Sequence, residues 1–273
     1  VDGGGSRGQI NASVTGTTLT QTHRQDIVNF EKGMKINFYT ASSGGSVRAG
    51  GPLTISSVNR AAGSMVVSAN LSTITSLAEN DYIVREGDYD AVGAGLLAWI
   101  PTSAPGATSF YGVDRTTDTT RLGGYRYDAS ALSIEDGLQI VASELSVEGG
   151  NPDVVYMHPV QATNLARELG NRAVYQDHKI AEFGFKALHI ATPFGLIPVL
   201  GDANCPYARA FMLQSDTWDM HSLGEGPKLL RTAAKDDGYV TVTTEDSLEV
   251  RVGAYYNYAC SAPGWNANIT LPT

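Results

Sequence analysis

Five carboxylates form the densest group of residues in this sequence that could carry chemistry: Glu79, Asp81, Glu86, Asp88 and Asp90. Close carboxylates can supply the oxygen ligands of calcium or the acid and base pair of a glycosidase. Their spacing does not follow the twelve-residue calcium loop, and charge on edge strands is a common protection against aggregation. We therefore expect a hairpin with solvated charges here and no metal site.

A glycine-rich segment, Gly93–Ala98, has the G-x-G-x-x-A spacing of a dinucleotide-binding turn. Such a turn needs a long helix directly after it, yet Pro101 and Pro105 follow within a few residues. The preceding acidic residues Asp88 and Asp90 would also repel a phosphate. The phosphate-loop pattern ending in Gly-Lys-Ser/Thr does not occur in the sequence. We expect no nucleotide cofactor.

The histidines are scattered and form no H-E-x-x-H motif; they are His23, His158, His178, His189 and His221. His158 directly precedes Pro159, where its ring or backbone would cap a helix. Neither Cys205 nor Cys260 lies in a motif that marks a nucleophile, and no G-x-S-x-G elbow is present. We predict no catalytic, cofactor-binding or metal-binding residue and no enzyme, although a triad assembled from distant residues stays open.

Aromatic side chains offer a second kind of site. Trp99, Trp218 and Trp265, together with 13 tyrosines, could form a platform on which sugars stack. They are spread over all regions of the sequence, however, and tyrosine and tryptophan are enriched where protein subunits meet. We favour subunit packing over carbohydrate binding.

Composition excludes several classes of protein. The chain of 273 residues carries 28 acidic against 19 basic residues, a net charge of −9, which argues against a nucleic-acid-binding surface. Its longest apolar runs, Gly95–Ile100 and Phe194–Leu200, are far shorter than the roughly 20 residues that span a bilayer. Two cysteines indicate no disulfide scaffold and a reducing compartment. The sequence begins with Val1 instead of Met, and its first residues do not have the pattern of a secretory signal. We therefore expect a further segment upstream.

The first third of the chain predicts β-structure. After a flexible glycine-rich start over residues 1–8, residues 9–90 alternate apolar and polar residues in short runs separated by glycine-rich turns. The alternating pairs are Ile10/Ala12/Val14, Ile36/Phe38, Leu53/Ile55, Met65/Val67 and Tyr82/Val84. We predict a compact β-rich module, a small antiparallel barrel or sandwich.

The pattern changes to mixed helix and strand from Leu132. Ser133 and Asp136 resemble a capping box, and Gly149 with Gly150 would end the helix that it begins. Pro159 suits the first turn of a second helix that closes at Gly170. Strands are predicted over Val154–Met157, Tyr239–Thr243, Leu248–Val252, Tyr255–Tyr258 and Ile269–Leu271. The fold class is therefore α+β.

Several local patterns follow one another from Asp88 onward: Gly87–Leu96, the helix–strand–helix unit from Ser133 through Pro159, Phe194–Val199, Ala210–Trp218 and Val250–Tyr255. In this order they resemble the major capsid proteins of tailed bacteriophages, whose fold is named after phage Hong Kong 97. His158 stands where that family has asparagine, and Ile197 is an extra residue. The resemblance covers about residues 88 to 271.

The resemblance implies a division into domains. Residues 128–223 would form the axial α/β domain, residues 224–273 would supply strands of the peripheral domain, and residues 91–127 would connect them to the module of residues 9–90. The family's N-terminal arm, extended loop and spine helix would then lie upstream of residue 1. The β-rich module would be an insertion between the spine helix and the axial domain.

The resemblance also implies a function. The chain would be a structural protein that assembles with copies of itself into hexamers and pentamers of an icosahedral shell. That shell would enclose double-stranded phage DNA without sequence-specific contacts, and the acidic charge suits a wall that does not adhere to DNA. Scaffold, portal and decoration proteins would be its partners, and the virion, assembled in the host bacterial cytoplasm, its location. No cofactor and no membrane are implied.

Three alternatives remain. An encapsulin-type nanocompartment shell protein shares the fold but encloses an enzyme cargo. A β-rich carbohydrate-binding surface protein would use the aromatic residues, and a hydrolase would use a site that no motif reveals.

Overall fold

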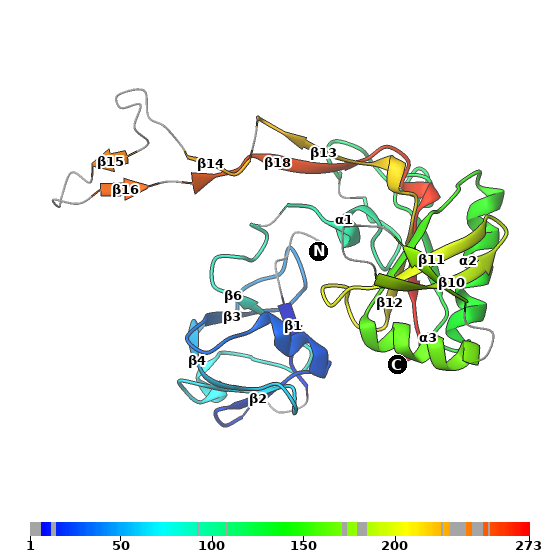
Figure 1. Cartoon of the computed structure of the whole chain (residues 1–273). Coiled ribbons are helices and arrows are strands. Elements are labelled where there is room, and N and C mark those ends of the chain that lie inside the picture. Colours follow the sequence, from blue (N-terminus) through cyan, green and yellow to red (C-terminus); the bar gives the residue numbers. More distant parts are fainter. Residues whose placement is uncertain are drawn as a thin grey trace. The chain divides into compact units, whose positions relative to one another are not determined.

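A computed structural model describes residues 7–11, 15–91, 93–107, 109–170, 174–178, 185–224, 226–229, 239–241, 248–250 and 252–273 (Figure 1). The chain divides into two compact units. The first unit comprises Val1–Thr217 and Ala262–Thr273, and the second comprises Trp218–Ser261. The first unit contains two separate hydrophobic cores, one built from residues 10 to 83 and the other from residues 129 to 271.

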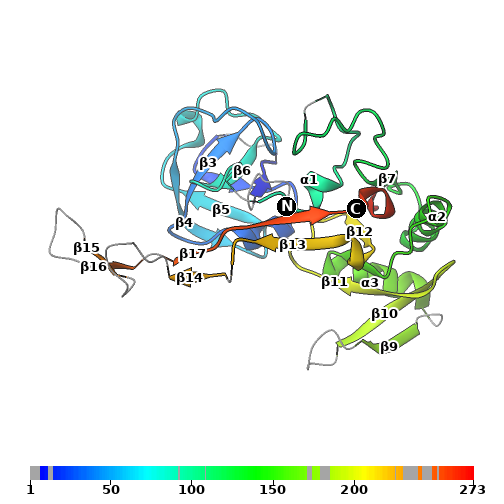
Figure 2. The same ribbon diagram turned by 90° about the horizontal axis from the view of Figure 1, so that it is seen from above.

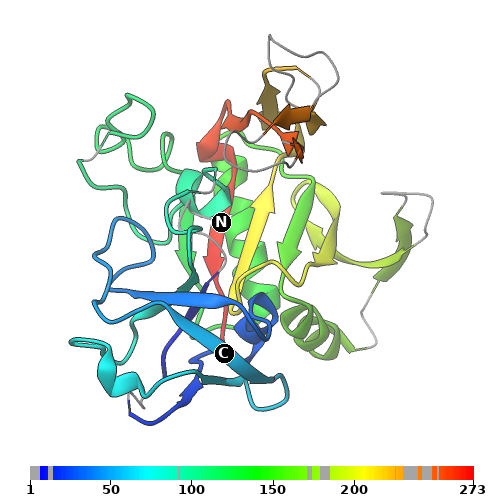
Figure 3. The same ribbon diagram turned by 90° about the vertical axis from the view of Figure 1, so that its left-hand side faces the viewer.

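The first core lies inside an antiparallel β-barrel (Figures 2 and 3). Its strands are β1 (Arg7–Gln9), β2 (Thr18–Thr20), β3 (Lys35–Tyr39), β4 (Leu53–Asn59), β5 (Ser64–Val67) and β6 (Tyr82–Arg85). They are hydrogen-bonded in the order β1-β6-β3-β4-β5-β2. A bridge between Ile10 and Gln21 joins the two edge strands, so the sheet closes on itself and leaves no free edge.

Alternation identifies the buried faces of three barrel strands and fails at a fourth. Ile36 and Phe38 of β3 point into the core, as do the predicted residues of β4 and β5. In β6 the prediction is wrong, because Ile83 joins the core while Val84 is buried outside it and Tyr82 is only half-buried. Adjacent Ile83 and Val84 are both fully buried, so both faces of this strand are covered and period two does not mark the inward face. Ala12 and Val14 lie outside the described residues.

The second core lies beneath a mixed seven-stranded sheet in the order β7-β19-β12-β8-β11-β10-β9. The strands are β7 (Tyr125–Asp128), β8 (Val154–Met157), β9 (Val174–His178), β10 (Phe185–Thr192), β11 (Gly195–Gly201), β12 (Arg209–Leu213) and β19 (Ala267–Thr270). Figure 1 shows helices α2 (Ile134–Val147) and α3 (Pro159–Leu169) together against this sheet. Their apolar stripes and the inward strand residues share one cluster of buried side chains, which confirms an α+β fold.

Both helices begin at the caps that the sequence predicts. The Ser133 hydroxyl accepts a hydrogen bond from the Asp136 backbone N–H at 3.1 Å, and the carboxylate of Glu168 accepts one from the Ile134 N–H. The His158 ring caps α3, because its Nδ1 accepts the Val160 N–H at 3.2 Å. An imidazole nitrogen that accepts a hydrogen bond must be unprotonated, and burial lowers the pKa of His158 accordingly.

The segment between the barrel and the sheet covers part of the sheet. It contains the single-turn helix α1 (Leu96–Trp99), and the amide of Asn268 on β19 donates to the Ile100 carbonyl at 2.9 Å. Gly124, just before β7, lies in the left-handed region with φ of 77°. A side chain there would collide with Ile100, so only glycine allows this close approach.

The sheet crosses the domain boundaries that the resemblance implies. Strand β19 pairs with both β12 and β7, so residues from 91–127, 128–223 and 224–273 share one sheet. Sequence order cannot show this, because β19 returns to the sheet after a long excursion of the chain. Short 3₁₀ turns flank that excursion at Ser215–Thr217 and Pro263–Trp265, and others occur in the barrel at Arg24–Asn29 and Leu71–Thr73.

The second unit is this excursion, a hairpin of three short strand pairs. Strand β13 (Trp218–Ser222) pairs with β18 (Tyr256–Cys260), β14 (Lys228–Leu229) with β17 (Val252–Gly253), and β15 (Tyr239–Thr241) with β16 (Leu248–Val250). Figure 2 shows the pairs following one another along the hairpin. Each pair stands as a two-stranded sheet.

Replacing Gly124 by alanine tests the close approach to Ile100. We expect Gly124→Ala to lower the free energy of unfolding by about 3 kcal/mol or more, because a clash adds to the backbone strain. Gly149 is the matched control: its φ is 83° and a side chain there would meet nothing, so Gly149→Ala should cost only about 1 kcal/mol. Chemical denaturation measures both, and equal losses would contradict the steric account.

Asp26, within Arg24–Asn29, gives the barrel a pH dependence. Burial raises the pKa of Asp26 from 3.8 to about 6, although the positive charge of Arg7 opposes the shift. The folded state thus binds this proton more tightly than the unfolded state, so the free energy of unfolding falls as the pH rises from about 4 to about 6.

We expect Asp26→Asn to raise the free energy of unfolding at pH 7.5 by up to about 3 kcal/mol and to change it little at pH 3.5. Asp114 is the control, because hydrogen bonds from Thr116 lower the pKa of Asp114 and its replacement should give no gain. Urea titrations of the unassembled chain between these pH values measure the effect. If the free energy of unfolding of Asp26→Asn depended on pH as strongly as that of the unmodified chain, Asp26 would not be the group responsible.

Candidate functional site

The five carboxylates do not come together as one site. Asp81 is buried and forms a two-pronged ion pair with Arg48, with N–O distances of 2.8 and 2.9 Å. Its carboxylate also accepts the Ala78 N–H at 2.9 Å. The expectation of solvated charge is therefore wrong for Asp81, although Glu79 and Glu86 are exposed. A buried pair of this kind fixes the chain before β6 and leaves its oxygens occupied.

Asp90 also has a structural role. Its two carboxylate oxygens accept hydrogen bonds from the Ser43 hydroxyl at 2.6 Å and the Gly44 N–H at 2.8 Å. The neighbouring Tyr89 stacks on Tyr39 with ring centres 3.6 Å apart. Across the described part of the chain, no group of three or more His, Cys, Asp or Glu side chains is arranged to hold a metal ion.

The glycine-rich segment leads into a helix of four residues, α1, with Gly95 as its N-cap. So short a helix lacks the aligned peptide dipoles and free N–H groups that hold a pyrophosphate in dinucleotide-binding folds. The geometry of α1 therefore does not suit a dinucleotide.

The described histidines and cysteines have different surroundings, and His221 is exposed on β13. His158 caps α3 and His189 is buried in β10. Burial raises the pKa of the Cys205 thiol to about 12, and the nearby Asp202 adds to this shift. A thiol with so high a pKa stays protonated near neutral pH and is a weak nucleophile. The side chain of His178 lies outside the described residues.

The three tryptophans have separate surroundings. Trp99 packs edge-on against Phe110 with ring centres 5.0 Å apart, and the indole N–H of Trp265 donates to the Glu148 carbonyl at 3.2 Å, far away in the sequence. Trp218 begins β13 in the hairpin. Side chains engaged in separate places do not make a shared stacking platform for sugars.

The hairpin carries the feature that the sequence did not identify. We call the pair β13 and β18 the ribbon. Its register opposes Met220 to Tyr258 and Ser222 to Tyr256, so these four residues share one face. The rings of Tyr256 and Tyr258 lie 5.6 Å apart in an edge-to-face arrangement. The other face holds Asp219, His221, Asn257 and Ala259.

The apolar face of the ribbon is open to solvent. Met220 is 62% exposed, Tyr256 52% and Tyr258 41%. Other exposed apolar side chains of the hairpin are Leu223, Leu229, Val250, Val252 and Tyr255. Leu223 and Tyr255 follow the register onto the face of His221 and Asn257. An isolated two-stranded sheet is marginal in water, and contiguous exposed apolar side chains mark interaction surfaces. This arrangement can bind a protein surface by burial of apolar area.

A shallow groove of about 430 Å³ lies beside the ribbon, lined by His221, Leu223 and Tyr255 among others. It forms where the Leu223 N–H donates to the Tyr255 carbonyl at 2.9 Å, beyond the last residue pair of the ribbon. Backbone pairing therefore continues by one residue pair past the ribbon.

The sequence contains one signal of the ribbon, but this signal does not identify the exposed apolar face. The aromatic run Tyr255–Tyr258 was predicted as a strand, but its partner Trp218–Ser222 was not. Trp218 and Met220 alternate with Asp219 and His221, which is the period of a strand with one apolar face. The local pattern could not show that this strand pairs with the distant aromatic run.

Within the part of the chain that the structure describes, no helix combines the length and apolar character needed to cross a bilayer. A search of curated proteins finds no match to the chain. Residues 77–255, however, match the family described as SU10 major capsid protein. The matched region runs from the last barrel strand through β12 of the seven-stranded sheet and into the hairpin as far as Tyr255, so that it ends before β18. On this match the chain belongs to the SU10 major capsid protein family of phage structural proteins.

Proposed function

We propose that this chain builds an icosahedral phage shell by assembling with copies of itself into hexamers and pentamers around double-stranded DNA. Family membership supports the structural capsid role, self-association and a place in the virion. The observation that carries the finer proposal is the exposed apolar face of the ribbon, because a shell subunit must bury such surface against its neighbours.

The energetics suit assembly from many modest contacts. Complete burial of a Met or Tyr-sized apolar side chain contributes about 1.5 to 3 kcal/mol, so the three large side chains of the ribbon face can contribute several kcal/mol per neighbour. A closed shell repeats each contact around every capsomer, and linked contacts reinforce one another. Individual contacts can thus stay weak enough for assembly to correct its errors.

We further propose a fold of the Hong Kong 97 type. The axial domain of residues 128–223 would hold α2, α3 and most strands of the seven-stranded sheet, which β7 and β19 complete from the flanking segments. The hairpin, which begins at Trp218, would belong with the peripheral strands of 224–273. The barrel would be the inserted module of residues 9–90, joined through residues 91–127. The two separate cores support the distinction between barrel and axial domain, because each can keep its own fold while contacts between subunits change.

Charge supports confinement of DNA without adhesion. The net charge of −9 opposes binding to phosphate backbones, so packaged DNA would be retained by the closed wall. We propose scaffold, portal and decoration proteins as further partners, and assembly in the host cytoplasm. The role is geometric, so we propose no catalytic activity; the family is one of structural proteins.

Assembly of ribbon variants tests this function. We expect Met220→Ser combined with Tyr258→Ser to raise the protein concentration needed for particles at least about 100-fold, because both replacements remove buried apolar area at each contact. The matched control, Asp219→Ser combined with Ala259→Ser, alters the opposite face at the neighbouring residue pair, away from the groove. Light scattering and electron microscopy of the full-length product measure assembly.

Unfolding of the unassembled variants separates assembly from folding. The seven-stranded sheet and the barrel have their own cores, so their thermal unfolding should be the same in both double variants. Particles that form at the parental concentration when Met220 and Tyr258 are serine would contradict the proposed role of the ribbon face.

A further inference from the structure

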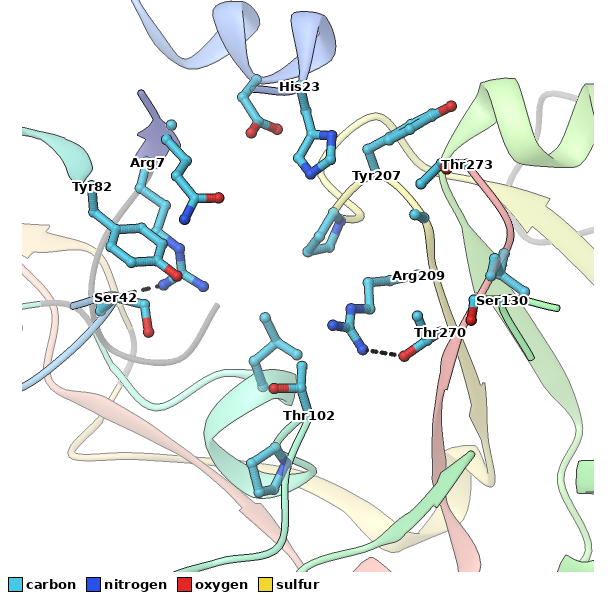
Figure 4. Close-up of a pocket in the computed structure, with 18 of the residues that line it drawn as sticks. Arg7, His23, Ser42, Tyr82, Thr102, Ser130, Tyr207, Arg209, Thr270 and Thr273 are labelled. Atoms are coloured by element: carbon cyan, nitrogen blue, oxygen red, sulfur yellow. Dashed lines mark hydrogen bonds between the residues drawn. The ribbon is translucent and has the colours of Figure 1, made fainter. Parts of the chain in front are cut away.

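A cavity of about 560 Å³ opens within the first unit, between barrel residues and residues of the seven-stranded sheet (Figure 4). The barrel contributes Arg7, His23 and Tyr82, and the sheet contributes Arg209 and Thr270. This volume lies in the range of small-molecule sites in proteins. Its lining combines guanidinium groups and hydroxyls with apolar side chains such as Leu97 and Leu271.

Arg209 on β12 is the principal charged group of the cavity. Its guanidinium is partly buried and donates one hydrogen bond, from Nη1 to the Thr270 hydroxyl at 2.7 Å. Ion pairs within the described residues do not include Arg209. Burial lowers the pKa of Arg209, and the charge of Asp128 nearby only partly offsets this. Guanidinium groups withdrawn from water are normally matched by an anion, and most of the five N–H donors here remain available for one.

Arg7 on β1 faces the same cavity from the barrel. Its Nη1 donates to the Ser42 carbonyl at 3.4 Å, and the guanidinium lies over the Tyr82 ring at 5.6 Å. Figure 4 shows the side chains of Arg7 and Arg209 reaching into the cavity from opposite walls. Two guanidinium groups held on strands of separate cores can thus contact one ligand between them.

One carboxylate shares the cavity. Asp26 lines it, and because burial raises the pKa of Asp26 to about 6, the group exchanges its proton close to neutral pH. A carboxylate disfavours a fully ionised ligand but accepts a hydrogen bond from a ligand oxygen that keeps its proton. Phosphate keeps such a proton near neutral pH, whereas sulfate does not.

We propose that this cavity binds a phosphate-type oxyanion between Arg7 and Arg209, and that the bound ion ties the barrel to the seven-stranded sheet. A tetrahedral oxyanion presents oxygens to both walls at once, whereas a simple carboxylate presents two oxygens on one edge. The hydroxyls of Tyr82 and Thr270 supply further hydrogen-bonding groups. The proposal does not depend on shell formation.

Titration of the full-length, unassembled chain with inorganic phosphate at pH 6.5 and constant ionic strength tests the proposal. We expect saturable binding by calorimetry and a rise in Tm of about 5 °C at saturation, because a ligand that binds the folded state stabilises it. Sulfate should bind at least tenfold more weakly. If phosphate and sulfate raised the Tm equally and neither saturated, the cavity would bind an adventitious ion only, and the proposal would be overturned.

Variants locate the site. Arg209→Gln and Arg7→Gln should each abolish the phosphate-dependent rise in Tm. The two residues lie on β12 and β1, which belong to different sheets, so if one variant misfolds the other still provides the test. Arg121→Gln is the control, since Arg121 is exposed and pairs with Asp118 and Glu148 at 3.9 and 3.7 Å outside the cavity. A rise that persists in both cavity variants would refute the assignment.

The source of the phosphate group is tested by competition. Adenosine monophosphate and a single-stranded oligonucleotide of eight to ten thymidines are titrated against phosphate-loaded protein. We expect the small phosphates to compete and the oligonucleotide to bind no more tightly than it binds Arg209→Gln. If the oligonucleotide bound the unmodified chain but not Arg209→Gln, and free phosphate did not bind, the ligand would be a nucleic-acid backbone. That result would overturn the proposal.

Discussion

The backbone pairing of β13 with β18 sets the constraint on which the proposed function depends. Because side chains alternate along paired strands, the register that opposes Met220 to Tyr258 gathers the apolar side chains on one face and the polar ones on the other. Half-exposed apolar side chains on a two-stranded ribbon are costly in water. Association that covers this face therefore lowers the free energy of each subunit, and no reactive group is required.

The first unit supplies a stable body for such association. Its barrel closes through the Ile10–Gln21 bridge, so it presents no open edge to neighbouring copies. Its seven-stranded sheet receives β19 after the hairpin, which places both ends of the excursion on one well-packed core. The ribbon that exposes its apolar face thus lies outside the two hydrophobic cores that maintain the fold. A protein that must be stable alone and must also bind its own copies requires this separation.

Local signals in the sequence predicted much of this fold. Caps and glycines placed α2 and α3 correctly, because helix ends depend on neighbours within a few residues, as at Ser133 and His158. The pairing of β19 with β7 and of β13 with β18 joins distant segments and leaves no local trace. The same reason explains the missed ribbon face, and Asp81 was misjudged because its partner Arg48 lies 33 residues away. The arginines of the cavity come from strands of two cores, which no motif spacing records.

Hydroxyl-radical footprinting of particles against unassembled subunits tests the role of the ribbon face most directly. Oxidation of Met220 and Tyr258, read by mass spectrometry, should fall at least tenfold in particles, while exposed Val147 on α2 serves as a reference position for probe dose. Equal oxidation of the two ribbon residues in both states would show that assembly leaves this face uncovered, and would contradict its role as a contact between subunits.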